Sequence, residues 1–520
     1  CCYRFSAAFT VLPTALAHPS SHSNTCSFAS STMTTTATDA KTFADTSESY
    51  RELLSRLQQI KNLEQASAVL HYDQMVSMPA AASAARGAQM SALAGLIHEK
   101  NTDHKLVEIL AKAEQDLKVY GGTFLKDENH VIQLAREEMD KKQKISAELE
   151  AKRASLSASA YAAWVEARKN NDYESFRPVL QDCFDTAKET AEAIRGEDTS
   201  KDVYTVLLDE FERGMPAERI DAIFDEIQGK LVPLLKRVLE SQTPSSTDCL
   251  KGSFDVEGQK KLSQEIVTAL GFDESRGRID VSVHPFTTSF SPADVRITSR
   301  FSDKEWYQGL AGSVHEGGHA IYEQNLGDSN TEVDSFLSMG CHESQSLFWE
   351  RHISLSKPFW EWATPLLKKH LALAQEQDWT PEQVYGAVNN VSPGLIRVEA
   401  DELTYPLHVI LRYQLEKQII QGELDLADLP ARWNKGMKEM LNVDVPTDSE
   451  GCLQDVHWSG LAIGYFPTYL LGATCAAQLA YYCGKEVENF EGKIASGDFA
   501  SIKAWLTEKV HRHGRRYPSL

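Results

Sequence analysis

Apolar residues recur at helical spacing along most of the chain. A period near 3.6 residues runs through four stretches, at about 46–70, 87–118, 216–242 and 256–270. Residues 127–195 are rich in Glu, Lys, Ala and Gln and break at 170–173, which predicts a long helical hairpin whose charged faces meet solvent. Residues 196–200 (GEDTS) have the composition of a loop. The pattern predicts a mainly α fold.

One stretch alternates apolar and polar residues instead. Residues 279–286 (IDVSVHPF) and 294–301 (DVRITSRF) are rich in β-branched side chains and follow a period of two. We expect two or three short strands there, which form a small β-sheet.

A single helix is predicted directly after these strands. Residues 302–305 (SDKE) fit a capping box, with serine at the cap and glutamate three residues later. Apolar residues then recur at roughly helical spacing from Trp306 to Ile321, and Gly327 supplies a stop signal. The helix should therefore span about 303–325.

This helix carries His315 and His319 four residues apart, with Glu316 after the first. Residues i and i+4 of a helix lie on one face, about 6 Å apart along the axis, so both imidazoles can reach one tetrahedral ion. Glu316 points about 100° away around the axis, which suits a base acting on water at the metal. The alternative is a solvated helix face that happens to carry two histidines.

Two glycines, Gly317 and Gly318, stand between the histidines. Each glycine costs about 1 kcal/mol relative to alanine in a helix interior. Two in a row are expected where another group must approach the backbone closely. That group belongs either to the functional site or to a tightly packed neighbouring helix.

The charge balance limits the classes of partner. Lys and Arg number 53 against 74 Asp and Glu, so the formal net charge is −21. An acidic surface argues against nucleic acid or an anionic membrane as the main partner. No run of about 20 apolar residues predicts a transmembrane helix. The nine cysteines form no C-x-x-C pair, and the six beyond residue 40 are expected to be reduced thiols in the core.

The first 38 residues differ from the rest. They contain no Asp, Glu or Lys, and Arg4 is the only firm charge. The apolar run 9–17 (FTVLPTALA) fits a short secretory signal or part of a transit peptide. In a third interpretation, translation starts at Met33. We therefore treat residues 1–40 as a disordered or targeting segment outside the fold.

A catalytic zinc ion usually takes three protein ligands, so a third ligand is needed. The version of the motif with a third histidine is excluded, because Tyr322 and Asn325 stand where it needs glycine and histidine. A glutamate from the following segment is the other common solution. We select Glu343, which starts the next predicted helix 24 residues after His319, and interpret Glu350, two turns further on, as a face charge. The other candidates are Glu323, as an indirect partner or a helix contact, and Glu332, in the loop.

Several blocks of the chain, taken together and in order, resemble the carboxypeptidase Taq family of zinc-dependent metallocarboxypeptidases. The resemblance covers about 45–515, nearly the whole body of the chain. In one block, Tyr72 replaces a tryptophan that is usual in the family. The blocks are HYDQMVSMP (71–79), HPF (284–286), DVRIT (294–298), HEGGHAIYEQ (315–324), HESQS (342–346), IRVEADELTYPLH (396–408) and GCLQDVHWSGLAIGYFPTYLLG (451–472).

The resemblance implies that His315, His319 and Glu343 hold the metal and that Glu316 is the general base and acid. Zinc is the expected metal, with cobalt or manganese as alternatives, because a site with nitrogen and oxygen ligands accepts all three. The oxyanion needs a further donor, for which Tyr405 and His457 are the candidates. A core phenol is the alternative for Tyr405, and a structural histidine packed on Trp458 is the alternative for His457.

A carboxypeptidase must also grip a free C-terminal carboxylate, which a planar guanidinium binds in bidentate fashion. Arg397 is our first candidate and Arg296 the second. Each has an alternative role in an internal ion pair, with Glu399 and Asp294 respectively. His284 either lines the pocket or only ends a strand. Asp401 or Glu402 is expected to orient the imidazoles that bind the metal.

The expected protein is a single mainly helical catalytic domain, 41–520, with a deep groove, the metal at its floor and the small sheet beside the H-E-x-x-H helix. Its expected activity is removal of C-terminal residues from peptides with broad specificity. A zinc endopeptidase or oligopeptidase, and a catalytically dead helical scaffold, are the alternatives. The resemblance implies a homodimer. We expect a cytoplasmic location, or an organellar or secretory one if residues 1–40 are a genuine targeting peptide.

Overall fold

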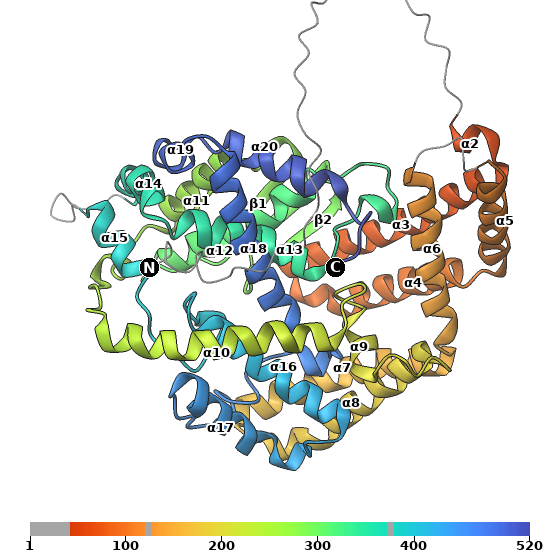
Figure 1. Cartoon of the computed structure of the whole chain (residues 1–520), viewed down its shortest axis with the longest axis horizontal. Helices are drawn as coiled ribbons and strands as arrows, with labels where there is room; N and C mark the ends of the chain where they lie inside the picture. The colour runs from red at the N-terminus through yellow and green to blue at the C-terminus, as the bar shows by residue number, and fades with distance from the viewer. Residues whose placement is uncertain (1–41, 121–125, 372–378, 520) are drawn as a thin grey trace, which may run out of the picture.

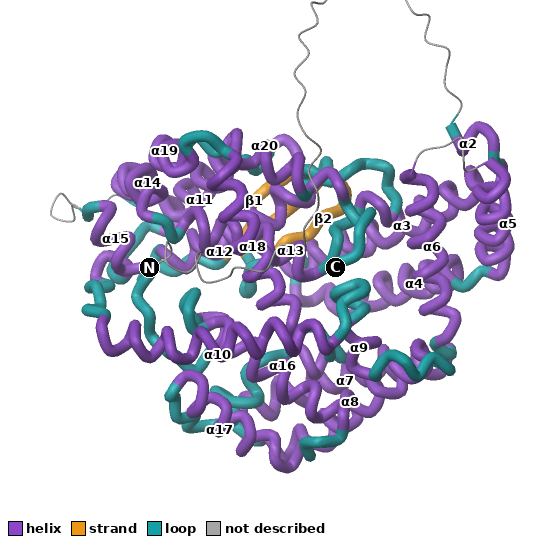
Figure 2. Tube along the Cα trace, viewed as in Figure 1, coloured by secondary structure: helices purple, strands orange, loops and turns teal. Residues whose placement is uncertain are grey.

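The structure is a computed structural model that describes residues 42–120, 126–371 and 379–519. Three groups of helices, each around its own hydrophobic core, make up the molecule (Figure 1). Residues 1–40, which we expect to be a disordered or targeting segment, lie outside the described residues. The mainly helical fold class with a small sheet is confirmed (Figure 2).

The first group lies on the right of Figure 1 and contains the N-terminal helices, whose buried residues form one core. Its long helix α3 reaches from this group to the sheet, where the Tyr72 ring packs edge-on against Phe286 and Phe290. The Tyr72 hydroxyl donates to Asp280 of strand β1 (Gly277–Val281). The helices are α2 (Phe43–Thr46), α3 (Glu48–Val76), α4 (Ser83–Asn101), α5 (His104–Tyr120) and α6 (Lys126–Lys144).

The second group lies at the bottom of Figure 1, with α10 running along its upper side. The predicted hairpin is present as α7 and α8, and it turns at Asn171, which adopts the left-handed conformation with φ of 53°. A further break at Ser146, which caps α7, separates α6 from the hairpin. The helices are α7 (Ala147–Asn170), α8 (Tyr173–Arg195), α9 (Val203–Leu208), α10 (Ala217–Ser241), α16 (Tyr405–Gln421) and α17 (Leu429–Leu441).

The third group, at the upper left of Figure 1, holds the sheet and the histidine helix. Helix α18 joins it to the second group, because Leu470 lies in one core and Ala476 in the other. The helices are α11 (Val256–Leu270), α12 (Tyr307–Glu323), α13 (Met339–Leu347), the π-helix η5 (Phe348–Ser354), α14 (Lys357–His370), α15 (Pro381–Val388), α18 (Phe466–Glu486), α19 (Phe490–Ser496) and α20 (Ala500–Lys509).

The predicted strands are confirmed as a three-stranded sheet in the order β1–β3–β2. Strand β3 (Asp294–Ser299) runs parallel to β1 (Gly277–Val281) and antiparallel to β2 (Thr287–Ser291). Val295 and Ile297 of β3 are buried in the same core as α12, which explains their alternation with polar residues. The sheet therefore lies against the histidine helix, as the sequence predicted.

The start of α12 differs from the prediction. The helix begins at Tyr307, and the side chain of its N-cap residue Trp306 makes no capping hydrogen bond. Glu305 instead pairs with Lys251 in an antiparallel bridge, and its carboxylate accepts the backbone N–H of Gln308 at 2.9 Å. The predicted capping box is therefore wrong, because the bridge holds this segment extended.

The two glycines of α12 permit close packing on both sides of the helix. A Cβ atom on Gly317 would lie 2.7 Å from Val267 Cγ1 of α11. A Cβ atom on Gly318 would lie 2.6 Å from Ser346 Cα of α13. Tight helix packing thus explains both glycines, and it sets the distance between α12 and α13.

We predict that Gly318→Ala lowers the free energy of unfolding by about 1–3 kcal/mol, because the added methyl group overlaps backbone atoms of α13. Gly87→Ala is the matched control. Gly87 lies exposed in α4 with open space around it, so alanine should stabilise by about 0.4–1 kcal/mol. Urea denaturation of both variants measures the difference, and equal stability of the two would contradict this account.

Candidate metal centre

Three side chains from two helices converge on one point. His315 and His319 project from α12 and Glu343 from α13, and one ligand atom from each lies within 4.8 Å of the others. His319 Nε2 is 3.7 Å from a Glu343 carboxylate oxygen, and the two imidazole rings are nearly perpendicular. Two imidazoles and one carboxylate are a donor set typical of catalytic zinc.

The Nδ1 atoms of both imidazoles already have partners. His315 Nδ1 is 2.6 Å from a Glu350 carboxylate oxygen, and His319 Nδ1 is 3.0 Å from the His342 carbonyl oxygen. Both acceptors hold a proton on Nδ1, so Nε2 is the nitrogen whose lone pair a metal ion can take in place of a proton. This arrangement fits two histidines that ligate a metal through Nε2.

Glu350 was interpreted as a face charge from the sequence, and that interpretation is wrong. It lies on the π-helix η5, which follows α13 directly, and its carboxylate reaches His315. Asp401 and Glu402 were expected in this role. Asp401 instead accepts backbone N–H groups of Ser392 and Leu403.

The other two candidate ligands from the sequence have different partners. Glu323 accepts from His342 Nε2 at 3.0 Å, and the His342 ring stacks on His319 with centroids 4.2 Å apart. Glu323 therefore acts on His319 indirectly, by holding the His342 ring that stacks on it. Glu332 pairs with Lys61 and Arg515 at 3.0 and 3.2 Å.

Negative charge surrounds the three converging side chains. Burial disfavours the charged form of His315, but nearby carboxylates, with Glu350 first, outweigh burial and raise its pKa to about 10. Burial, helped by the neighbouring histidines, holds the pKa of His319 well below its usual value. The site therefore favours a cation, which a divalent metal ion supplies.

Glu316 follows His315 on α12, but its carboxylate contacts the sheet and not the three converging side chains. Its carboxylate accepts a hydrogen bond of 2.6 Å from the Thr287 hydroxyl of β2, so the sheet fixes its orientation. Burial raises the pKa of Glu316 above its usual value, although His315 opposes the shift. The sequence offered no sign of Thr287, since only the fold brings β2 to α12.

Tyr405 begins α16 with its ring buried and stacked under the Arg351 guanidinium, whose central carbon is 4.3 Å from the ring centroid. Within the described ranges, its hydroxyl has no hydrogen-bond partner. Burial and the Glu343 carboxylate raise the pKa of Tyr405, so the phenol stays protonated. A neutral O–H donor is thus available within electrostatic reach of Glu343.

His457 lies in a different environment from the one its neighbour Trp458 suggested. Its Nε2 is 3.0 Å from the Tyr469 hydroxyl, and its ring packs on Phe466 with centroids 4.5 Å apart. Burial lowers its pKa to about 4, so the ring is neutral.

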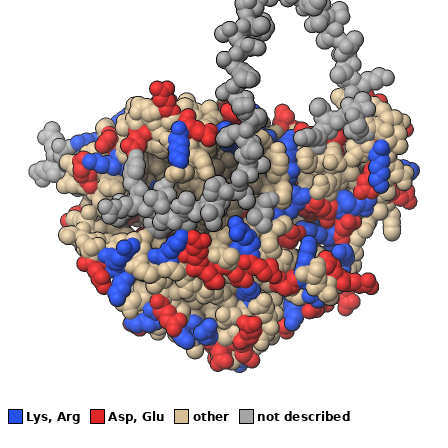
Figure 3. All heavy atoms as spheres, viewed as in Figure 1, with Lys and Arg blue, Asp and Glu red and all other residues tan. Residues whose placement is uncertain are grey.

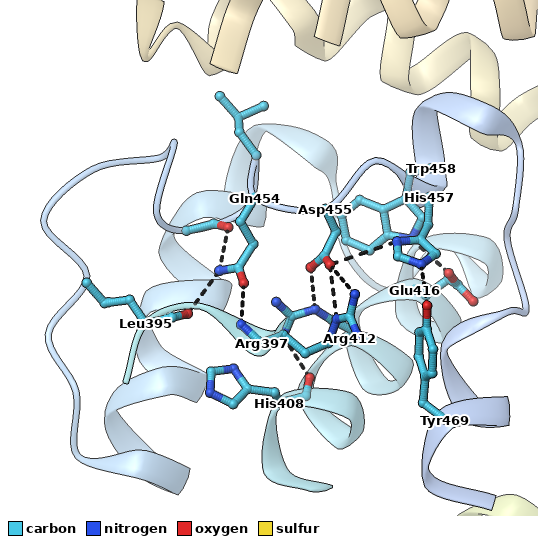
Figure 4. Close-up of polar contacts among 12 residues, drawn as sticks. Leu395, Arg397, His408, Arg412, Glu416, Gln454, Asp455, His457, Trp458 and Tyr469 are labelled. Carbon is cyan, nitrogen blue, oxygen red and sulfur yellow. Dashed lines mark hydrogen bonds and ion pairs between the residues drawn. The ribbon is translucent and has the colours of Figure 1, made fainter. Parts of the chain in front are cut away.

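Arg397 forms an internal ion pair, but with Asp455 rather than Glu399 (Figure 4). Its Nε and Nη2 both lie 3.0 Å from the same Asp455 oxygen. The other Asp455 oxygen accepts from Arg412 Nε at 2.6 Å.

The remaining predicted residues lie at the sheet. Arg296 is paired with Asp294 by two hydrogen bonds of 2.9 and 2.8 Å, which is the alternative that the sequence allowed, and it stacks over Phe290. His284 is exposed in the loop between β1 and β2. Neither residue contacts the three converging side chains.

Known proteins resemble this chain over most of its length. The sequence model of the carboxypeptidase Taq (M32) metallopeptidase family matches residues 52–520. Carboxypeptidase 1 of Bacillus subtilis is 37% identical over 90% of this chain and 92% of its own length, and thermostable carboxypeptidase 1 of Thermus thermophilus is 35% identical over 90% and 92%. The solved structure of Trypanosoma cruzi metallocarboxypeptidase 1 is 34% identical and superposes with a TM-score of 0.86, covering 91% of this chain and 94% of the other.

We predict that Glu350→Gln weakens metal binding about 10- to 100-fold, because the amide cannot hold the His315 Nδ1 proton as strongly as the carboxylate does. Titration of the metal-free protein in competition with a chelator measures the affinity. Glu332→Gln is the matched control, since Glu332 lies in the same stretch of sequence but pairs elsewhere. Unchanged affinity in the Glu350 variant would contradict the orienting role.

Proposed function

The chain belongs to the carboxypeptidase Taq (M32) family and is a metallocarboxypeptidase, and from this premise we propose that it removes residues one at a time, with broad specificity, from peptides with a free C-terminus. The observation that carries the proposal is the convergence of His315, His319 and Glu343 on one point. We propose residues 41–520 as one catalytic domain.

His315, His319 and Glu343 are the proposed ligands of a divalent metal ion, which we propose to be zinc, with cobalt or manganese as alternatives. When bound, the ion supplies Lewis acidity that lowers the pKa of water and polarises a carbonyl. The partners of both Nδ1 atoms keep the imidazoles turned toward the ion. The His315 side chain is 25% exposed, so solvent reaches the site.

Glu316 is the proposed general base and acid. Its raised pKa brings the carboxylate closer to neutrality, where it both accepts a proton from water and returns it to the leaving amine. The Thr287 hydroxyl holds one carboxylate oxygen at 2.6 Å, which leaves the other oxygen for the proton. Each transfer then needs no rearrangement of the side chain.

Tyr405 is the stronger of the two proposed oxyanion donors. Its hydroxyl is protonated and makes no hydrogen bond to the described residues, so it is available to a developing negative charge. His457 already faces the Tyr469 hydroxyl through Nε2. We propose that His457 contributes indirectly, through its contact with the Tyr469 hydroxyl.

Arg397 is the proposed anchor for the terminal carboxylate of the peptide. Asp455 occupies the edge formed by Nε and Nη2, which leaves Nη1 and the second Nη2 proton as an open edge. That edge has the geometry for a second, bidentate carboxylate. Arg296 and His284 remain secondary proposals for contacts with more distant parts of the peptide.

The setting of the site favours peptides over large charged polymers. Acidic and basic side chains are interspersed on the face shown in Figure 3, and the net charge is −21. Among the described residues, no helix combines the length and apolar character needed to cross a membrane. We propose a groove that leads to the metal, a homodimer and a cytoplasmic location. The six cysteines of the described ranges are unpaired, which supports a reducing compartment.

A pair of peptides with one sequence, one ending in a free acid and one in an amide, tests the proposed function. We expect successive loss of single C-terminal residues from the acid, seen as a ladder by mass spectrometry and abolished by a chelator. The rate of cleavage of the amide should be lower by a factor of about 100 or more, because the amide lacks the negative charge that Arg397 binds. Internal cleavage of both peptides would favour the endopeptidase alternative.

We predict that Glu316→Gln lowers kcat about 10²- to 10⁴-fold while the protein still binds one metal ion per chain, because the amide cannot take up a proton. Metal content and turnover are measured on the same sample. Glu361→Gln, on the exposed face of α14, is the matched control and should keep full activity. Full activity of the Glu316 variant would contradict the assigned role and show that another group acts as the base.

A further inference from the structure

We infer that Asp455, backed by the buried Arg412, is a positioning residue that turns the open edge of the Arg397 guanidinium toward the substrate and so makes the enzyme selective for a free chain end. The inference rests on the proposed function, since it assigns the residues that give Arg397 its role. The three side chains come from distant segments, and Figure 4 shows Asp455 between the two arginines.

Asp455 uses each carboxylate oxygen for a different arginine. One oxygen accepts a hydrogen bond from Arg397 Nε at 3.0 Å and lies 3.0 Å from its Nη2, and the other accepts from Arg412 Nε at 2.6 Å. Because both guanidiniums are fixed by one carboxylate, neither can rotate without losing a charged hydrogen bond. Arg397 is thereby held in one orientation.

Arg412 anchors this arrangement from behind. It is fully buried, stacks over the Trp433 ring at 4.5 Å, and donates from Nη1 to the His408 carbonyl at 2.8 Å. Its Nη2 has no partner within the described residues. Arg412 therefore has no route to a substrate, and its contacts serve to fix Asp455.

Backbone and ring contacts further restrict the orientation of Arg397. Its N–H donates to Gln454 Oε1 at 3.0 Å, and the residue next to Gln454 is Asp455 itself. The guanidinium lies over the Tyr469 ring at 4.6 Å. Tyr469 lies about one turn before Gly472 on α18, and Gly472 packs against Glu343, so this helix links the arginine cluster to the proposed metal ligands.

The cluster formed by Arg397, Arg412 and Asp455 carries more positive than negative charge. Two buried guanidiniums face one carboxylate, while burial lowers the pKa values of His457 and His408 to about 4 and about 3, so both rings are neutral. One positive charge therefore remains uncompensated within the cluster. A buried excess charge is costly unless an anion pairs with it, and a peptide's terminal carboxylate supplies one.

A purely structural ion cluster is the competing explanation. Such a cluster would stabilise the junction between α16 and the segment before α18, and its loss would reduce all activities in parallel. Positioning of Arg397 predicts a different result, because only substrates with a terminal carboxylate use that guanidinium. The ratio of kcat/KM for a free-acid peptide to kcat/KM for its amide separates the two.

We expect Asp455→Asn to lower this ratio about 10- to 100-fold, the usual cost of losing a hydrogen bond between charged groups, mainly by raising KM for the acid. In an Arg397→Met background, Asp455→Asn should change the ratio less than about twofold, since the two residues act as one unit. Parallel loss of both activities, or independent effects of the two substitutions, would overturn the inference.

Asp221→Asn is the matched control. Like Asp455, Asp221 joins two side chains, Lys417 at 2.5 Å and the Tyr413 hydroxyl at 2.6 Å, but it links α10 to α16 and does not contact Arg397. The ratio should stay within about twofold of wild type. A wild-type enzyme that cleaves acid and amide equally would refute the proposed function, whereas an unchanged preference in Asp455→Asn would refute only this inference.

Arg412→Lys carries the test if Asp455→Asn does not fold. Lysine keeps the buried charge but cannot hold Asp455 and the His408 carbonyl with one planar group, so we expect the ratio to fall about 3- to 10-fold. Thermal melting confirms that the variant is folded before kinetics are measured. A folded Arg412→Lys enzyme with the wild-type ratio would contradict the role of Asp455.

Discussion

The close approach of α13 to its two neighbours determines where the proposed metal ligands meet. On one side, Gly318 of α12 leaves room for the α13 backbone, and on the other, Gly472 of α18 leaves room for Glu343, whose Cβ would lie 2.8 Å from a methyl group there. Because α12 carries both histidines, these two contacts bring Glu343 to the imidazoles. The site is therefore set by helix backbones that belong to a packed core, which gives it the rigidity that metal ligation and catalysis require.

The charges of the site are arranged in two opposing parts. Carboxylates surround the two histidines, whereas two arginines share one carboxylate around Asp455. Tyr405 and Tyr469 lie within the electrostatic field of both parts. In the proposed function, the terminal carboxylate of the peptide lies toward the arginines and the carbonyl of the preceding residue toward the histidines, so this separation of charge sets the direction in which a peptide binds.

The features that depend on residues close together in the sequence could be predicted from it, and those that depend on contacts between distant segments could not. The i, i+4 histidines, the alternating strands and the choice of Glu343 over nearby glutamates follow from local patterns that the fold preserves. Glu350 was misread because it was treated as an isolated surface charge, although residues i and i+7 share a helix face and Glu350 follows Glu343 by two turns. The partner of Arg397 was missed because Asp455 lies 58 residues away, and the start of α12 because a bridge to Lys251 overrides the capping pattern.

The most direct test of the account is a crystal structure of the zinc-loaded protein with anomalous diffraction at the zinc edge. We predict one strong peak, about 2.0–2.1 Å from Nε2 of both His315 and His319 and about 2.0–2.2 Å from a Glu343 oxygen. A peak that lacks Glu343 as a ligand, or one that is bound through Nδ1 of either histidine, would contradict the central claim.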